Sequence, residues 1–148
     1  MTVLVRRPVA DEKEAWKGLF VDYLEFYRSA LSDAIIEHTW RCIHDEGSSI
    51  DAFVAEAEGK LVGLTHYVFH ASTWDDRPSC YLEDLYVAPS ARGSRTAREL
   101  IAAVEGAARG ANAFQLYWLT QQYNGPARSL YDTITPPSSF IVYQKTLA

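Results

Sequence analysis

The segment from Tyr81 to Arg109 constrains the fold most strongly, because a strand, a glycine-containing loop and a helix follow one another there. Tyr81–Val87 is rich in apolar and aromatic residues, as strands are, and Ala88-Pro89 closes it. Between Arg95 and Arg109, apolar residues recur at helical spacing. The start of a helix presents unpaired N–H groups and a partial positive charge, so this junction predicts a site for a diphosphate.

The side chains at this junction favour an anion site. Gly93 allows the backbone to approach a ligand closely, and the small Ala97 leaves the helix start unshielded. Arg92, Arg95 and Arg98 would add charge-assisted contacts. The alternative interpretation is a solvated helix start without a ligand.

The hydrophobic pattern of the whole chain predicts an α+β fold with the element order β-α-α-β-β-β-α-β-α-β. Glu58-Gly59-Lys60 indicates a hairpin turn between the second and third strands. The expected strands lie at Thr2–Pro8, Asp51–Glu58, Leu61–Ala71, Cys80–Val87, Phe114–Thr120 and Phe140–Lys145. The expected helices contain Trp16–Tyr27, Ile35–Ile43, Arg95–Arg109 and Pro126–Asp132.

Composition limits the class of protein. A chain of 148 residues with 48% hydrophobic residues suffices for a real core, so residues 1–148 are expected to form a single domain. The net charge of -5 argues against a nucleic-acid partner and mildly favours an amine. No apolar run is long enough to span a bilayer, so no membrane partner is expected. Two distant cysteines, Cys42 and Cys80, fit a reduced setting, and a cytoplasmic location is the default expectation.

Two histidines, His66 and His70, lie four residues apart on a predicted strand and so share one face. A metal site needs at least a third ligand, and none is placed with them. We therefore expect no metal, and we interpret both as structural histidines or as cleft residues near a substrate.

The residues Arg92-Gly93-Ser94-Arg95-Thr96-Ala97 resemble the Gln/Arg-x-x-Gly-x-Gly/Ala motif of the GCN5-related N-acetyltransferase (GNAT) family. The strand Tyr81–Val87, followed by Pro and then Arg-Gly, is similar to the branch that contains diamine acetyltransferases and their bacterial relatives. Arg95 stands where the family usually has its first motif glycine, and it either adds a phosphate contact or marks a weakened site. The resemblance implies a mixed, mostly antiparallel central sheet with helices on both faces.

The same resemblance implies an N-acetyltransferase that uses acetyl-CoA as co-substrate and no metal. The acetyl group would pass by direct attack on the thioester to the primary amine of a small molecule, such as a polyamine, a lysine-like compound or an amino acid. Backbone groups at Leu85–Val87 would pair with the pantetheine arm like an added strand. The cofactor-binding residues that the resemblance implies are Leu85, Tyr86, Val87, Arg92, Gly93, Ser94, Arg95, Thr96, Ala97, Arg98 and Asn124.

Two residues are candidates for proton transfer by their positions in this family. Glu83 would be the base that keeps the attacking amine neutral, and an ordinary ion pair on a strand is the alternative. Tyr131 would be the acid that protonates the leaving thiolate, because it lies in the helix after Phe114–Thr120 and follows Asn124. A core tyrosine beside Leu130 is the alternative for this position.

The acceptor side of the cleft is expected near the first two helices, which line it in this family. Tyr27 or Glu25 would meet a cationic amine there through its ring or its charge. Asp84 is a further candidate for the acceptor contact or the base. A loop with Trp74, Asp75 and Asp76 also has the composition to border the acceptor.

Two other functions compete with a small-molecule acetyltransferase. One is a non-catalytic acyl-CoA-binding module, which Arg95 in place of glycine suggests. The other is an acetyltransferase that acts on lysines of a protein or peptide. Members of this family commonly form dimers, often through C-terminal strands, so the expected partners are a small-molecule amine and a second copy of the chain.

Overall fold

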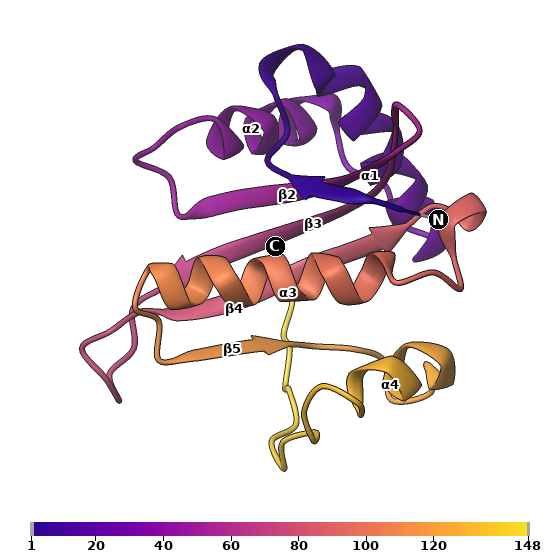
Figure 1. Ribbon diagram of the computed structural model, residues 1–148. Coiled ribbons are helices and arrows are strands. Elements are labelled where there is room, and N and C mark those ends of the chain that lie inside the picture. The colour runs from indigo at the N-terminus through magenta and orange to yellow at the C-terminus, as the bar shows by residue number, and fades with distance from the viewer. Residues whose placement is uncertain (1, 148) are drawn as a thin grey trace.

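The computed structural model describes residues 2–147, which build one five-stranded sheet flanked by helices (Figure 1). The strands are β1 (Leu4–Arg6), β2 (Ile50–Ala57), β3 (Lys60–His70), β4 (Ser79–Val87) and β5 (Gln115–Trp118). The helices are α1 (Lys13–Phe26), α2 (Asp33–Ile43), α3 (Thr96–Gly110) and α4 (Gly125–Tyr131). Two short 3-10 turns, η1 (Ala10–Glu12) and η2 (Pro89–Ala91), connect them.

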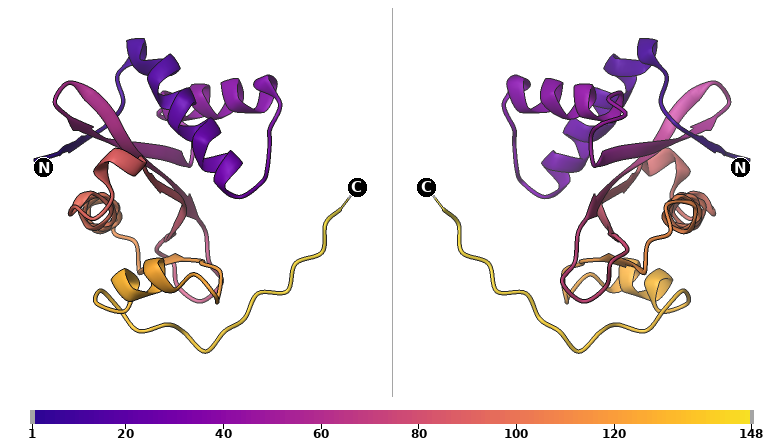
Figure 2. Two further views of the ribbon diagram at one scale, coloured as in Figure 1. Left: turned by 90° about the vertical axis from the view of Figure 1, so that its right-hand side faces the viewer. Right: turned by 90° about the vertical axis from the view of Figure 1, so that its left-hand side faces the viewer.

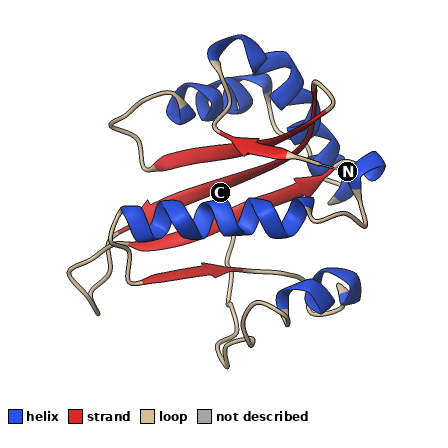
Figure 3. Cartoon of the chain, in the orientation of Figure 1, coloured by secondary structure: helices blue, strands red, loops and turns tan. Residues whose placement is uncertain are grey.

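The strands lie in the order β1-β2-β3-β4-β5 (Figure 3). Neighbouring strands are antiparallel except β4 and β5, which are parallel. The hairpin between β2 and β3 closes through Glu58 and Gly59, whose φ angles of 51° and 77° are the left-handed pair that a tight two-residue turn requires. The predicted mixed, mostly antiparallel sheet is confirmed.

Helices cover both faces of the sheet, as predicted, and Figure 2 shows α3 on one side and the two N-terminal helices on the other. The helical spacing indicates most of the buried residues of these helices, whereas Ile35, which the spacing also places on the apolar face of α2, is 49% exposed. The first face buries Trp16, Leu19, Phe20, Ile36, Trp40 and Ile43 from α1 and α2. The second face buries Leu100, Ile101, Val104 and Ala108 from α3. The sheet centre is therefore covered on both sides.

Gly63 on β3 lets the start of α3 lie close to the sheet. A Cβ atom at this position would lie 3.1 Å from the Tyr86 carbonyl oxygen and 3.2 Å from the Thr96 side chain. These separations are tighter than ordinary van der Waals contact. A larger residue at position 63 would therefore push the first turn of α3 away from β4.

The two halves of β4 have different partners. Its first half pairs in parallel with β5, and the last pair joins Leu82 to Trp118. Its second half, up to Val87, keeps β3 on one side and has no strand on the other side among the described residues. The sheet therefore opens between β4 and β5 in the direction of α3 and α4.

A β-bulge marks the point where β4 loses its second partner. Tyr67 of β3 opposes Leu82, whereas the preceding residue His66 opposes Asp84. Glu83 is therefore the extra residue of the bulge. Bulges occur often beside active sites because they redirect side chains.

The prediction of a final strand at Phe140–Lys145 is wrong. These residues form no helix or strand, and the segment extends away from the sheet (Figure 2). Its side chains are exposed, with Phe140 at 79% and Tyr143 at 92%. A strand needs a hydrogen-bonding partner as well as suitable residues, and the backbone after Pro136-Pro137 does not return to the free edge of β5.

Candidate active site

The outer edge of the second half of β4 carries accessible backbone groups. Ala88 donates its N–H to the Val62 carbonyl oxygen at 2.8 Å, on the β3 side. In an antiparallel ladder, the backbone groups of successive residues point to alternate sides, so Tyr86 also directs its groups toward β3. Leu85 and Val87 direct theirs to the open edge. Of the three residues predicted to pair with a ligand, two are therefore placed to do so through the backbone.

The loop after β4 is fixed by Arg92 and Gly93. The Arg92 Nε donates to the Val87 carbonyl oxygen at 3.1 Å, and the guanidinium lies 5.8 Å from the centre of the Tyr86 ring. Gly93 has a φ of 78°, in the left-handed region that favours glycine. The loop thus turns tightly into α3 while Arg92 is held at the end of the open edge.

Arginine at position 95 imposes no backbone strain. Arg95 precedes α3 with φ of −83° and ψ of 8°, a conformation available to any L-residue. Its side chain is exposed. Any effect of having arginine where the motif has glycine therefore comes from the side chain and not from the path of the loop.

The first turn of α3 presents N–H groups without partners inside the helix. The Thr96 N–H donates to Ser94 Oγ at 3.3 Å, and the two hydroxyls lie 2.7 Å apart. Arg98 differs from the prediction, because its Nη2 donates to Thr133 Oγ1 at 2.7 Å. That contact ties α3 to the end of α4. Among the predicted diphosphate contacts, the free guanidinium nearest the helix start is that of Arg95.

Glu83 sits on the bulge with an exposed side chain. Loss of water around its carboxyl raises the pKa above the ordinary value, and the charge of Asp84 raises it further. None of the ion pairs between described residues includes Glu83. The predicted alternative of an ordinary ion pair is therefore absent, and a raised pKa makes the carboxylate a better proton acceptor.

Asp84 is joined to two buried side chains. Its Oδ2 lies 2.8 Å from His66 Nδ1, across the strand pair. On the other side of the imidazole, the Trp16 indole Nε1–H donates to His66 Nε2 at 2.9 Å. His66 is only 3% exposed. The chain Trp16–His66–Asp84 connects α1, β3 and β4.

Two tyrosines, Tyr23 of α1 and Tyr27 at the C-cap of that helix, face Asp84. Burial raises the pKa of Tyr23, and the Asp84 carboxylate raises it further. The same two causes, in the same order, raise the pKa of Tyr27. The two rings meet edge to face with their centres 5.1 Å apart. The prediction that Tyr27 lies on the acceptor side is thus consistent with its proximity to Asp84.

Glu25 does not share this position. At 100° per residue, it lies about 200° around α1 from Tyr23 and faces away from Asp84. Its side chain is exposed. The helical spacing that brings Tyr23 and Tyr27 together turns Glu25 to the opposite side of α1, so of the two predicted acceptor contacts only Tyr27 lies toward Asp84.

Tyr131 lies at the end of α4 and is half-buried. Its ring meets that of Trp118 edge to face at 5.4 Å. Burial raises its pKa, and the neighbouring phenol of Tyr27 adds to the shift, so the phenol stays protonated at neutral pH. Asn124 caps the same helix, because its Oδ1 accepts from the Ala127 N–H at 3.4 Å.

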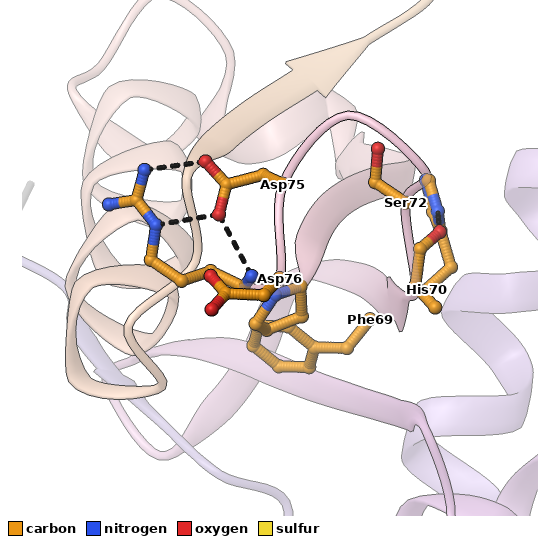
Figure 4. A pocket seen from close by; sticks show the side chains of 8 residues that line it. Phe69, His70, Ser72, Asp75 and Asp76 are labelled. Atoms are coloured by element: carbon orange, nitrogen blue, oxygen red, sulfur yellow. Dashed lines mark hydrogen bonds and ion pairs between the residues drawn. The ribbon is translucent and has the colours of Figure 1, made fainter.

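A hollow of about 320 Å³ lies elsewhere, against the loop between β3 and β4 (Figure 4). Asp75 and Asp76 lie across it from His70 and Ser72. The Asp75 carboxylate accepts two hydrogen bonds from the Arg77 guanidinium and a third from the Arg77 backbone N–H. This loop precedes Ser79, whereas the open edge lies near Leu85, about 20 Å along the strand at 3.3 Å per residue. The loop therefore does not border the groups described above, contrary to expectation.

Neither a cluster of metal ligands nor a membrane-spanning helix occurs within residues 2–147. No group of three or more His, Cys, Asp or Glu side chains is arranged to hold a metal ion in this part of the chain. No helix within the same residues has the length and apolar character needed to cross a membrane.

Comparison with known proteins decides the family. The model of the acetyltransferase (GNAT) family matches residues 14–133. The chain belongs to this family. It is 26% identical over 145 residues to the D-amino-acid N-acetyltransferase HPA3 of Saccharomyces cerevisiae, covering 97% of this chain and 90% of that protein. It is 30% identical over 128 residues to the uncharacterised N-acetyltransferase YhfO of Bacillus subtilis, covering 86% and 85% of the two chains.

Solved structures support the same fold. The structure of AAC(6')-Iy in complex with the bisubstrate analogue CoA-S-monomethyl-acetylneamine matches with a TM-score of 0.82 and 20% sequence identity. The match covers 99% of this chain and 100% of that one. The chain is therefore an acetyltransferase with the GNAT fold, of a family that uses acetyl-CoA to acetylate amines.

The residues of this chain fit acetyl-CoA as co-substrate. The backbone edge at Leu85 and Val87 can receive an extended amide-containing arm, as in strand addition. The tight turn at Gly93 leads to the N-terminus of a 15-residue helix, where a diphosphate is favoured.

The position of Tyr23 and the partner of His66 are not predicted from the sequence. Helical spacing places Tyr23 on the apolar stripe of the predicted helix Trp16–Tyr27, which favours a core tyrosine, although its spacing of four from Tyr27 also indicates a shared face. The pairing of His66 with Asp84 depends on the strand register and on the bulge. No local sequence signal specifies that register.

Proposed function

We propose that residues 1–148 form a single N-acetyltransferase domain that transfers the acetyl group of acetyl-CoA to the primary amine of a small cationic molecule. The observation that carries this proposal is the end of β4–β5 pairing at Leu82. Directly beyond it lie an open backbone edge and the two carboxylates of Glu83 and Asp84.

The cofactor would be held along β4 and the loop that follows. Backbone groups of Leu85 and Val87 would pair with the pantetheine arm, and the N–H groups at the start of α3 would receive the diphosphate. Arg95 has an exposed side chain beside that helix start and would add a charge-assisted contact. Asn124 caps α4 beside this arm and would contact the cofactor from the other side.

The chemistry needs one base and one acid. Glu83 takes a proton from the ammonium of the acceptor, directly or through water, and leaves a neutral amine. As the nitrogen–carbon bond forms and the carbon–sulfur bond breaks, a backbone N–H of the open edge stabilises the oxyanion. Tyr131 donates its phenolic proton to the departing thiolate, and the surplus proton of the acylated nitrogen returns through water to this phenolate, so that a neutral amide and free CoA thiol result. The raised pKa of Tyr131 keeps its phenolic proton in place at neutral pH.

The charges near Asp84 favour a cationic acceptor. Asp84 raises the pKa values of Tyr23, Tyr27 and Tyr81, Glu83 raises that of Tyr81, and no lysine or arginine contributes to these shifts. An ammonium group among phenols and carboxylates is stabilised by charge and by the aromatic rings. Polyamines and lysine-like compounds therefore fit better than amino acids whose own carboxylate lies beside the reacting amine, in contrast to the name of the yeast relative.

An assay with acetyl-CoA and matched amines tests this function. We expect free thiol to appear fastest with a diamine or with the lysine side chain, and slowest with a D-amino acid that has no side-chain amine. Turnover only with lysine-containing peptides would favour a protein acetyltransferase. Binding of CoA without turnover for any amine would favour the non-catalytic module and refute the enzymatic role.

The pH dependence of kcat tests the base. The carboxylate form of Glu83 is the proton acceptor, and it is lost as the pH falls through the raised pKa of this group. At saturating amine, kcat should decline on the acidic side. Glu83→Gln should remove this decline and lower the neutral-pH kcat by about 10²-fold. An unchanged profile in the variant would place the base elsewhere.

We also propose a homodimer that forms through the C-terminal segment. Two observations support it. One is the family resemblance, and the other is a run of four consecutive exposed apolar residues, Phe140, Ile141, Val142 and Tyr143. Scattered single apolar residues are normal on a protein surface, whereas a contiguous apolar patch is typical of an interface. Light scattering should give a dimer for the full chain and a monomer for a chain that ends at Thr135. A full-length monomer, or a dimer that survives truncation, would exclude this arrangement.

A further inference from the structure

The imidazole of His66 is enclosed by partners that leave it only one protonation state. Trp16 Nε1 carries a hydrogen and has no lone pair to accept with, so it can only donate. Its hydrogen bond of 2.9 Å to His66 Nε2 therefore requires a lone pair on that nitrogen. The single proton of a neutral ring must then reside on Nδ1, which lies 2.8 Å from the Asp84 Oδ2.

Burial strengthens this restriction. His66 packs against the Phe20 ring at 4.8 Å and is only 3% exposed, so water cannot replace either partner. A second proton on Nε2 would point at the indole N–H and would break the bond to Trp16. No buried side-chain nitrogen or oxygen of the described residues lacks a hydrogen-bond partner. The hydrogen-bonded series Trp16–His66–Asp84 therefore needs no further donor or acceptor.

The consequence falls on Asp84. One carboxylate oxygen accepts from a ring that cannot rotate, and the side chain is held in one orientation. The part of the carboxylate that is still free to accept hydrogen bonds faces Tyr23 and Tyr27, on the acceptor side. A neutral N–H donor also leaves the full negative charge of Asp84 available, whereas an imidazolium would neutralise it.

We propose that His66 is a positioning residue, locked by Trp16 as the Nδ1–H tautomer, which aims the Asp84 carboxylate at the ammonium group of the acceptor. This inference rests on the proposed function, because it assigns the acceptor contact within the same site. Asp84 touches the amine in this scheme, and His66 and Trp16 act only through it.

The first test reads the tautomer directly and needs no turnover. Nitrogen-15 NMR of the imidazole in the intact protein should show a neutral ring protonated at Nδ1. Trp16→Phe removes the donor that occupies Nε2 and should therefore let this nitrogen take a second proton. Trp40→Phe is the matched control, because it removes an indole from the same core but does not remove the hydrogen bond to His66. The ring centres of Trp40 and Trp16 are 4.9 Å apart. An imidazolium or an Nε2–H ring in the wild type would overturn the proposal.

The second test reads the acceptor. His66→Leu should raise the KM for a diamine about tenfold, as expected for the loss of one hydrogen bond to a charged group, with the KM for acetyl-CoA unchanged. His66→Asn keeps an N–H near the position of Nδ1 and should restore most of the loss. In an Asp84→Asn background, His66→Leu should have less than about a twofold effect. Additive effects would show that His66 does not act through Asp84.

The pH dependence separates positioning from loss of packing. In Trp16→Phe, the KM for the diamine should rise as the pH falls from 8 to 6, because an imidazolium competes with the ammonium for Asp84. The other titratable groups that influence this region are Tyr23, Tyr27, Tyr81 and Glu83. They are present equally in Trp40→Phe, which should lack the additional rise. Equal profiles in both variants would contradict the proposal.

The outcomes of the two proposals are distinguishable. No turnover with any amine, together with a locked Nδ1–H tautomer, would refute the acetyltransferase function and with it the role of the lock in catalysis. Turnover with a freely titrating His66 would refute only the positioning role.

Discussion

The two sides of the site are built very differently. One side is the sheet centre, where β4 is paired with β3, α1 and α2 bury one face, and α3 buries the other. The other side is the C-terminal quarter, where β5 has four residues, α4 has seven, and both are at most half-buried. The carboxylates Glu83 and Asp84 belong to the first side, and Tyr131 belongs to the second.

This difference indicates how the work of the site is divided. A base and an ammonium contact must be oriented accurately, and the bulge and the buried imidazole provide that orientation. A protonated phenol needs only to reach a sulfur atom, so a short helix at the sheet edge suffices. Contacts such as Arg98 to Thr133 then connect the weaker side to α3.

The largest expected effect tests whether Tyr131, on the less buried C-terminal side, takes part in proton transfer. Tyr131→Phe should lower kcat by about 10³-fold without unfolding the protein, because only the proton donor is lost. Tyr123→Phe is the control, since that phenol is 84% exposed in the same region. Steady-state rates with thermal melting measure both. A loss smaller than about tenfold would assign the acid to another group.

The second effect compares the stability of the two sides. Leu64→Ala removes a fully buried side chain at the sheet centre and should cost about 3 kcal/mol in the free energy of unfolding. Leu116→Ala removes the same atoms from the half-buried β5 and should cost about 1 kcal/mol, because less area is lost. Urea denaturation gives both values, and equal costs would remove the contrast.

The smallest effect concerns the helix start that borders both sides. If Arg95 contacts a phosphate, Arg95→Gly should weaken CoA binding about threefold, as expected for one exposed charge pair. Arg109→Ala, at the far end of α3, should leave binding unchanged. Tighter CoA binding by Arg95→Gly would instead show that arginine at this position weakens the motif. Backbone strain cannot explain either result, because the φ of Arg95 is already negative.

Most of the fold followed from local patterns. The stripes of α1, α2 and α3, the hairpin at Glu58-Gly59 and the turn at Gly93 each depend on residues close in sequence. The exception, Phe140–Lys145, has strand-like residues, but its pairing depends on where the chain runs after Pro136-Pro137. Local propensity cannot supply a distant partner.

For the site, the sequence by itself determined the strand, the glycine loop, the helix start and, through family resemblance, the candidate roles of Glu83 and Tyr131. Only the tertiary structure decided that β4 loses its partner at Leu82, that the bulge places Asp84 opposite His66, and that Glu25 faces away. The reason is that helical and turn signals are local, whereas strand register and the partners of a buried imidazole are set by contacts between residues as far apart as Trp16 and Asp84.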